Sequence, residues 1–158
     1  MAYRASVVAN ELLKLAREDG SSLDPMKLQK LVYLAHGWSL LFLHRPLIQE
    51  KIKAWKYGPV IPELYDEFRE FRASPITRDA RGHDEGCTLD PAACKLIRKV
   101  WNTYRDQTAM QLSVMTHEPG YAWDLTQKIA RPWEDPTIED GLILDEFQRR
   151  MQLNQALR

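Results

Sequence analysis

The sequence contains little cysteine, no long apolar run and no excess of either charge. Its two cysteines among 158 residues, Cys87 and Cys94, are too few for a disulfide framework, so we expect free thiols. No apolar run approaches the roughly 18 residues of a membrane-spanning helix. Residues 1–4 lack the apolar core of a signal peptide. We therefore expect a cytosolic, cytoplasmic protein that makes no membrane contact.

The balance of charge bears on one class of function. Lysine plus arginine number 22, and aspartate plus glutamate also number 22, so the formal net charge is zero. This disfavours nucleic-acid binding through bulk positive charge, although a local basic patch stays open. An apolar content of 44% and five tryptophans indicate a folded protein, and 158 residues predict one domain with a real core.

Metal and cofactor motifs are also missing. His83, Cys87 and Cys94 form the sole Cys/His cluster, and they have no second pair of ligands, whereas structural zinc usually takes four. Gly58 and Pro59 are not surrounded by a Walker or dinucleotide-binding loop. We expect neither a metal nor a cofactor, and we interpret the three residues of the cluster as free loop residues.

His117, which lies beside Glu118, is the remaining candidate for catalysis. Neighbours on a chain rarely face each other productively, and no nucleophile elbow or glycine-rich turn accompanies them. We favour a structural interpretation, in which Thr116 and His117 hydrogen-bond helix ends and fix the turn before Pro119. No catalytic residue is predicted, and an enzyme that uses His117 is kept as an alternative.

The most apolar stretch of the chain predicts a central helix. It begins at Asp24–Pro25, a cap followed by a first-turn proline, and it ends before the proline at position 46. Apolar residues recur at three- and four-residue spacing and add a second stripe, which is typical of a helix with neighbours on several sides. They are Leu28, Leu31, Val32, Leu34, Ala35, Trp38, Leu41 and Phe42.

The remaining pattern predicts a mainly α, compact single-domain bundle of about six helices packed on the central one. Helices other than the central one are expected at 3–18, 62–71, 91–104, 109–115 and from 138 onward, with Asp90, Thr108 and Thr137 as caps. Tyr65 is expected on the inward face of the 62–71 helix. Alternation over 48–57 indicates a short extended segment between the second and third helices, followed by a turn at 57–59. Residues 73–89 are expected to be a mobile surface loop, and 118–136 an irregular Trp-rich segment.

A basic and aromatic stretch covers residues 51–57. Its three lysines alternate with Trp55 and Tyr57, a mixture that can bind phosphates and stack bases. The next helix carries an acidic outer face, so the molecule is electrically lopsided rather than basic, which suits docking on a protein. We interpret Trp55 as a core residue and leave the lysines open. The candidate partner contacts are Lys51, Lys53, Lys56, Glu63, Glu67 and Glu70.

Several stretches of the chain are similar to one known family. Met26–Ala35, Pro46–Leu47, Ala54–Tyr65, Leu112–His117 and Ile138–Phe147 together resemble the Panacea domain, also called the SocA-like antitoxin family of bacteria and phages. The first motif is long and specific, and the resemblance extends from about Val8 to Phe147. The family-motif positions are Lys27, Leu28, Gln29, Lys30, Leu31, Tyr33, Trp55, Tyr57, Gly58, Pro59, Tyr65, Leu112, Thr116 and His117.

The resemblance implies a non-enzymatic antitoxin that binds and neutralises a cognate protein toxin encoded beside it. At least one type in the family is an adaptor that delivers its toxin to a Clp-type protease, so such a protease is a second implied partner. The alternative is a nucleic-acid-binding transcriptional regulator of its own operon, which the neutral charge and the lack of a helix-turn-helix disfavour. Most motif positions are expected to build the scaffold. The toxin and the oligomeric state are not assigned.

Overall fold

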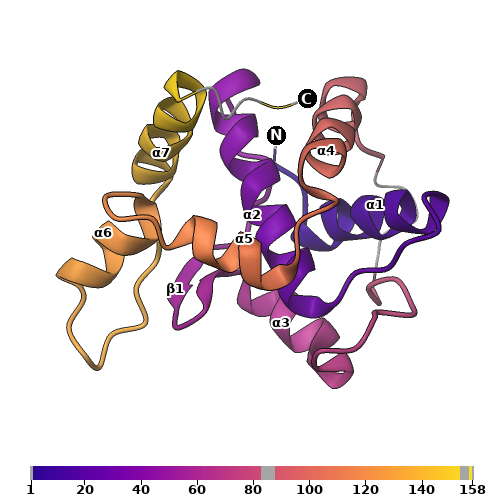
Figure 1. The fold of residues 1–158 in the computed structure, drawn as a ribbon, viewed down its shortest axis with the longest axis horizontal. Helices are drawn as coiled ribbons and strands as arrows, with labels where there is room; N and C mark the ends of the chain where they lie inside the picture. The colour runs from indigo at the N-terminus through magenta and orange to yellow at the C-terminus, as the bar shows by residue number, and fades with distance from the viewer. Residues whose placement is uncertain (1, 83–87, 154–156, 158) are drawn as a thin grey trace.

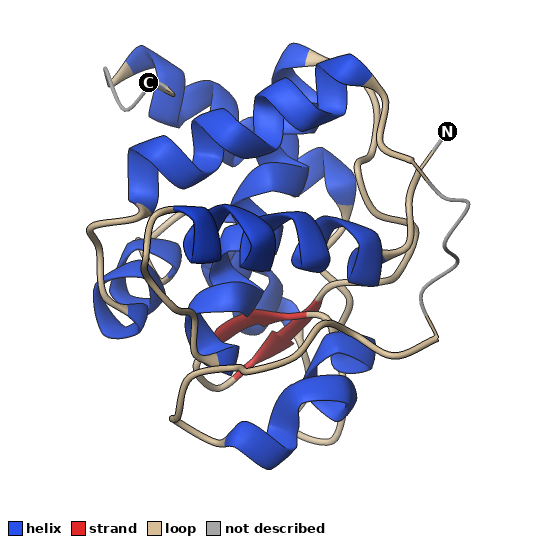
Figure 2. Cartoon of the chain, turned by 90° about the vertical axis from the view of Figure 1, so that its right-hand side faces the viewer, coloured by secondary structure: helices blue, strands red, loops and turns tan. Residues whose placement is uncertain are grey.

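The computed structural model describes residues 2–82, 88–153 and 157 of the chain. These residues form seven α-helices, one short 3₁₀ helix and a two-stranded antiparallel hairpin, which confirms the predicted mainly α class (Figures 1 and 2). The elements are α1 (Ala5–Glu18), α2 (Pro25–Phe42), β1 (Lys53–Trp55), β2 (Gly58–Val60), α3 (Pro62–Phe68), η1 (Arg69–Phe71), α4 (Pro91–Tyr104), α5 (Ala109–Thr116), α6 (Ala122–Ile129) and α7 (Asp140–Gln152).

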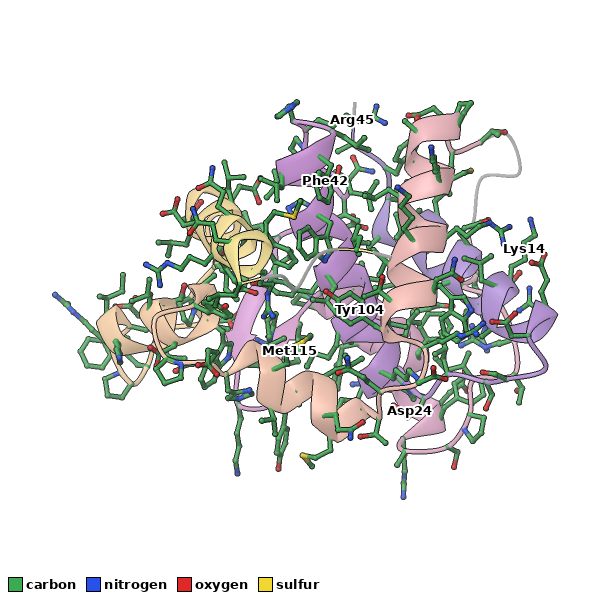
Figure 3. The ribbon with its side chains drawn as sticks, turned by 45° about the horizontal axis from the view of Figure 1, so that its top comes forward. Lys14, Asp24, Phe42, Arg45, Tyr104 and Met115 are labelled. Carbon is green, nitrogen blue, oxygen red and sulfur yellow. The ribbon has the colours of Figure 1, made fainter. Side chains whose placement is uncertain are left out.

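Helix α2 is the central element, as predicted. The Asp24 carboxylate accepts a hydrogen bond from the Lys27 amide at 2.9 Å, and Pro25 occupies the first turn. Every residue from Leu28 to Ser39 is buried. Helices α1, α3, α4, α5 and α7 and strand β2 all contact this helix. In Figure 3 it runs between the labelled Asp24 and Phe42, with α7 on one side and α4 on the other.

Aromatic rings and buried polar groups connect α2 to its neighbours. The Trp38 indole donates to the Tyr104 hydroxyl of α4 at 3.0 Å, and the Phe147 ring of α7 meets Trp38 edge-on with centroids 4.9 Å apart. The Tyr33 hydroxyl donates to Glu146 Oε1 at 2.8 Å, and Arg150 forms a fully buried ion pair with Glu146 at 2.8 Å. Burial raises the pKa of Glu146 even beside this guanidinium.

Asp90, at the start of α4, connects the N-terminal residues around Tyr3 to the 45–48 segment. The Asp90 carboxylate accepts hydrogen bonds from the Tyr3 hydroxyl and the Arg45 guanidinium, each at 2.6 Å, and from the Ala93 amide at 2.9 Å. These donors, with the Tyr3 hydroxyl first, hold the pKa of the Asp90 carboxyl well below its usual range. Asp90 is thus both the predicted cap of α4 and an anchor for two distant segments.

Two element predictions near the C-terminus are wrong. Residues 122–129, read as irregular, form α6, whose Asp124 carboxylate pairs with Lys128 at 2.9 Å one turn later. Helix α7 begins at Asp140, with Glu139 at the N-cap, and not after a Thr137 cap. Thr137 instead pairs with Lys53 in a strand-like bridge, and the Ile138 amide donates to the Ile52 carbonyl at 2.8 Å, so this segment continues the hairpin as a third extended stretch.

Three details around the hairpin also differ from the prediction. The turn lies at residues 56–57, because Gly58 and Pro59 belong to β2. Trp55 is half-buried rather than a core residue, and Tyr65, predicted to face inward, is 44% exposed. The Trp55 and Tyr65 rings meet edge-on with centroids 5.2 Å apart, so the two side chains cover each other at the surface.

The described part of the predicted 73–89 loop, residues 73–82 and 88–89, contains no helix or strand. Ile76 and Ala80 in it are buried, and the Ile76 amide donates to the Leu23 carbonyl at 2.8 Å. The Arg78 guanidinium binds the Glu67 carboxylate at 2.7 Å. This stretch therefore packs on the ends of α1 and α3. The predicted mobility stays a prediction, and residues 83–87 lie outside the described part.

Candidate functional site

The family-motif residues converge on the β1–β2 hairpin. In its register Lys53 faces Val60, Ala54 faces Pro59 and Trp55 faces Gly58. Gly58 has a φ of +115°, which disfavours any residue with a Cβ. A Cβ there would also lie 2.9 Å from both Lys30 Cε and Thr116 Oγ1. The glycine is thus needed both for its backbone conformation and for the close approach of α2 and α5.

Side chains from α5, its C-cap and α6 bind four consecutive backbone carbonyls of the hairpin, at residues 54–57. Backbone groups at a sheet edge otherwise stay unpaired and attract other chains, and here side chains satisfy them. The contacting atoms, in the order of the carbonyls, are Gln127 Nε2, Trp123 Nε1 at 2.7 Å, His117 Nε2 at 3.2 Å and Ser113 Oγ at 2.7 Å. We call this set the hairpin clamp.

Helix α2 holds the other strand of the hairpin. The Gln29 carboxamide accepts from the Ile61 amide at 2.8 Å and donates to the Ile61 carbonyl at 3.0 Å, as a neighbouring strand would do. The Lys30 ammonium donates to the Pro59 carbonyl at 3.2 Å. Both side chains are buried, which explains why polar residues interrupt an otherwise apolar helix at this point.

Thr116 and His117 form the turn that the sequence predicts. Thr116 Oγ1 donates to the Ser113 carbonyl at 2.7 Å, and His117 Nδ1 lies 2.6 Å from the same oxygen. The His117 ring also packs against Trp123, with centroids 3.9 Å apart. Both ring nitrogens therefore contact backbone carbonyls, so the imidazole joins the end of α5 to the hairpin.

The structure divides the fourteen motif positions into two groups. Those around the hairpin are Gln29, Lys30, Trp55, Tyr57, Gly58, Pro59, Tyr65, Thr116 and His117. The others serve the core or a helix end. Leu28, Leu31, Tyr33 and Leu112 are buried, and Lys27 donates to the Arg105 carbonyl at 2.6 Å and lies over the Trp101 ring.

A surface pocket of about 600 Å³ lies between the first turns of α2, the hairpin and α3. Its walls include Lys30 and the aromatic rings of Trp55, Tyr57 and Tyr65, and its lining also contains the exposed cations Lys56 and Arg72. Burial lowers the pKa of the Lys30 ammonium to about 8. We call this the Lys30 pocket. The sequence analysis missed it because its walls come from four separate segments.

The candidate partner contacts fall into two classes. Lys51, Lys56 and Glu63 are exposed. The other three already have partners within the chain. Lys53 donates to Thr137 Oγ1 at 3.0 Å, and Glu67 and Glu70 both pair with Arg78. Whether any of the six meets a partner protein stays a prediction.

The metal cluster considered in the sequence lies mostly outside the described residues, because these exclude His83 and Cys87. Cys94 is a free cysteine but lies in helix α4 and not in a loop, so that part of the interpretation is wrong. It is half-buried, and burial raises the pKa of its thiol. Among residues 2–82 and 88–153, no three histidine, cysteine, aspartate or glutamate side chains are arranged to hold a metal ion. In the same residues, no helix has both the length and the apolar character needed to cross a membrane.

Comparison with known proteins agrees with this geometry. Residues 28–124 match the family described as antitoxin SocA-like, Panacea domain, a range that contains Gln29, Lys30, the hairpin, Ser113 and Trp123. The chain is 33% identical over 129 residues to Antitoxin SocA of Caulobacter vibrioides (strain NA1000 / CB15N), which covers 77% of this chain and 69% of that protein. No solved structure matches significantly. The chain thus belongs to the SocA-like antitoxin family and is built on a Panacea domain.

Proposed function

We propose that this chain acts in the cytoplasm as an antitoxin that neutralises a cognate protein toxin by binding it directly. Family membership supports an antitoxin role, and the 33% identity to Antitoxin SocA carries that inference. The toxin itself, and the surface that binds it, are the finer part of the proposal.

The geometry of the hairpin clamp supports binding as the mode of action. Its polar side chains are engaged with backbone carbonyls, so the motif acts as a brace that fixes the hairpin and the aromatic side chains on it. Tyr57 at the tip is 57% exposed and Tyr65 beside it is 44% exposed. Rigid, exposed aromatic residues on a fixed scaffold are typical of the energetic centre of protein interfaces.

The test is co-expression of the tagged chain with the product of the adjacent reading frame, followed by affinity capture at low and high salt. We expect one stoichiometric protein partner that is retained at high salt and whose toxicity is suppressed in the cell. Capture of nucleic acid alone, with an affinity that falls steeply as salt rises, would instead identify the transcriptional regulator.

Binding is common to two routes of neutralisation, masking of the toxin and delivery of the toxin to a Clp-type protease. We propose that the chain can serve either route through the same bound complex. The half-life of the toxin in cells with and without the protease separates them. Neutralisation that persists without the protease indicates masking, and neutralisation that is lost while the complex still forms indicates delivery.

A further inference from the structure

Lys30 is a buried cation that has no acidic partner among the residues that the structure describes. The residue is 1% exposed, and the hydrogen bond that the structure gives its ammonium goes to the Pro59 carbonyl at 3.2 Å. Among the described residues no carboxylate forms an ion pair with Lys30, whereas the other buried cation, Arg150, is paired with Glu146. Lysine is almost never fully buried unless it is paired, and an ammonium has three donors to satisfy.

The surroundings of Lys30 point to an acidic ligand from outside the chain. The lining of the Lys30 pocket contains three cations, Lys30, Lys56 and Arg72, and no aspartate or glutamate. Asp24 and Asp66, which adjoin Pro25 and Tyr65 along the chain, do not belong to this lining. Glu67 and Glu70, which come shortly before Arg72, are paired with Arg78. The pocket is therefore an apolar and aromatic cavity with an exclusively positive charge pattern, which is complementary to carboxylates beside an apolar side chain.

Backbone strain supports a binding role for the rim of this pocket. Arg72 has a φ of +54° and a ψ of −116°, a conformation that non-glycine residues rarely adopt. Such strain tends to be kept at functional sites, where the position of a side chain matters more than local stability. Here it fixes the backbone from which the Arg72 side chain reaches the pocket lining, to which Lys56 also belongs.

We propose that the Lys30 pocket receives an acidic segment of the partner toxin, in which an aromatic or large aliphatic side chain lies against Trp55, Tyr57 and Tyr65 and a flanking carboxylate ion-pairs with Lys30. This rests on the proposed function, since it takes the partner to be a protein. Three cations around the cavity favour an internal Asp/Glu-containing segment over a chain terminus, because a terminus brings a single carboxylate.

A blocked peptide provides a probe that does not depend on the identity of the toxin. We would titrate acetyl-Glu-Phe-Asp-amide into the ¹⁵N-labelled protein and follow the backbone amides of residues 56–58, Val60 and Tyr65 by NMR. We expect saturable shifts at these positions, and binding about tenfold weaker for acetyl-Gln-Phe-Asn-amide, which has the same shape without the charges. Equal binding of both peptides, or shifts confined to other surfaces, would overturn the proposal. The proposal would also be overturned if the neutral peptide bound once its C-terminal amide was replaced by a free carboxylate, because the pocket would then recognise a chain terminus.

Variants assign the effect to the pocket. Lys30→Met keeps an unbranched apolar side chain and removes the charged end, and we expect it to weaken binding of the acidic peptide about tenfold while leaving binding of the neutral peptide unchanged. Lys56→Gln and Arg72→Gln change exposed side chains, so they test the pocket even if Lys30→Met does not fold. Lys95→Met, an exposed change on α4 away from the pocket, is the matched control and should bind as wild type. Unchanged binding in all three pocket variants would exclude the assignment.

The two proposals fail separately. If the adjacent gene product is captured and the pocket variants bind it as tightly as wild type, the antitoxin function stands and the pocket assignment is wrong. If no toxin is captured while the acidic peptide still binds in a Lys30-dependent way, the pocket is a peptide site and the proposed function is wrong.

Discussion

Gly37 of α2 lies directly against the ring of Phe147 of α7. A Cβ at position 37 would overlap three carbon atoms of that ring, so the two helices approach as closely as a backbone and an aromatic ring allow. Phe147 is fully buried and also contacts Trp38 and Tyr33 edge-on. The contact between Gly37 and Phe147 thus places α7 directly against the centre of α2.

Gly37→Ala should destabilise the protein by about 1–3 kcal/mol, because the added methyl group forces the Phe147 ring and α7 away from α2. The free energy of unfolding in urea measures this. Gly141→Ala is the matched control. Gly141 lies in α7 with open space around its Cβ position, so alanine there should be neutral or slightly stabilising. Equal behaviour of the two variants would contradict the close approach.

Trp38→Ala should destabilise the protein by about 3–5 kcal/mol, as for a large aromatic residue truncated in a packed core. The residue is fully buried, and its indole is hydrogen-bonded to Tyr104, so the change leaves both a cavity and an unpaired hydroxyl. Trp133→Ala, at a position that is 77% exposed, should change stability little. A thermal midpoint of Trp38→Ala equal to that of wild type would show that α2 is not the core element.

The starts of three helices could be predicted because the signals for each start lie within a few neighbouring residues. Asp24–Pro25, Asp90–Pro91 and Thr108 supply both a cap and a starting geometry within a few residues, and the structure has all three helix starts there. Thr137 carries the same local signal and is not a cap, because its segment pairs with Lys53 in the extended conformation. This long-range strand contact outweighs the local capping preference of Thr137, and the neighbouring sequence contains no signal of the contact.

The site was predictable in part only. Sequence resemblance placed Gln29, Lys30 and Gly58 in the first motif of one family and His117 in its second motif, but it could not say that Gln29 and Lys30 are buried against the hairpin backbone. That depends on side chains of α2 reaching residues about 30 positions later. One signal was present, namely the adjacent polar residues Gln29 and Lys30, which are among the few polar side chains in a mostly apolar helix. Such residues need buried partners, and the hairpin backbone supplies them.

Arg150→Met should destabilise the protein by about 3–5 kcal/mol at pH 7, because it leaves Glu146 buried without its counter-charge. Loss of the guanidinium raises the pKa of Glu146 further. The folded variant then holds a proton that the unfolded chain releases above its pKa of 4.5, so the unfolding free energy of the variant falls as the pH rises above that value. The defect relative to wild type should therefore be smaller at pH 5 than at pH 7.

Urea unfolding at the two pH values measures this difference, and Arg149→Met, an exposed neighbour, should be nearly neutral at both. The double variant Glu146→Gln/Arg150→Met should regain much of the lost stability, since no unpaired charge is then buried. A defect of the same size at pH 5 and pH 7 would show that Glu146 takes up no proton when its counter-charge is removed.

Because the Lys30 ammonium is buried, we expect the free energy of unfolding to rise with pH in the alkaline range. Its pKa is about 8 in the folded protein and 10.5 for a free lysine, so between these values the unfolded chain binds more protons and the unfolding free energy rises with pH. The full rise attributable to Lys30 is about 3 kcal/mol. The other charged lining groups, Lys56 and Arg72, are also cations, so no neighbouring carboxylate on the pocket wall opposes this shift.

Lys30→Met removes that titration. Its unfolding free energy at pH 7 should equal or exceed that of wild type, and the difference between the two proteins should shrink as the pH rises from about 8 to 10.5. The unfolding free energy of Lys95→Met should change with pH as that of wild type does. This control accounts for other groups that titrate at alkaline pH. If the unfolding free energy of Lys30→Met also changed with pH as that of wild type does, the Lys30 ammonium would not be desolvated in the free protein. The expected convergence would mean that the free antitoxin holds a destabilising charge at neutral pH, which an acidic partner segment would relieve on binding.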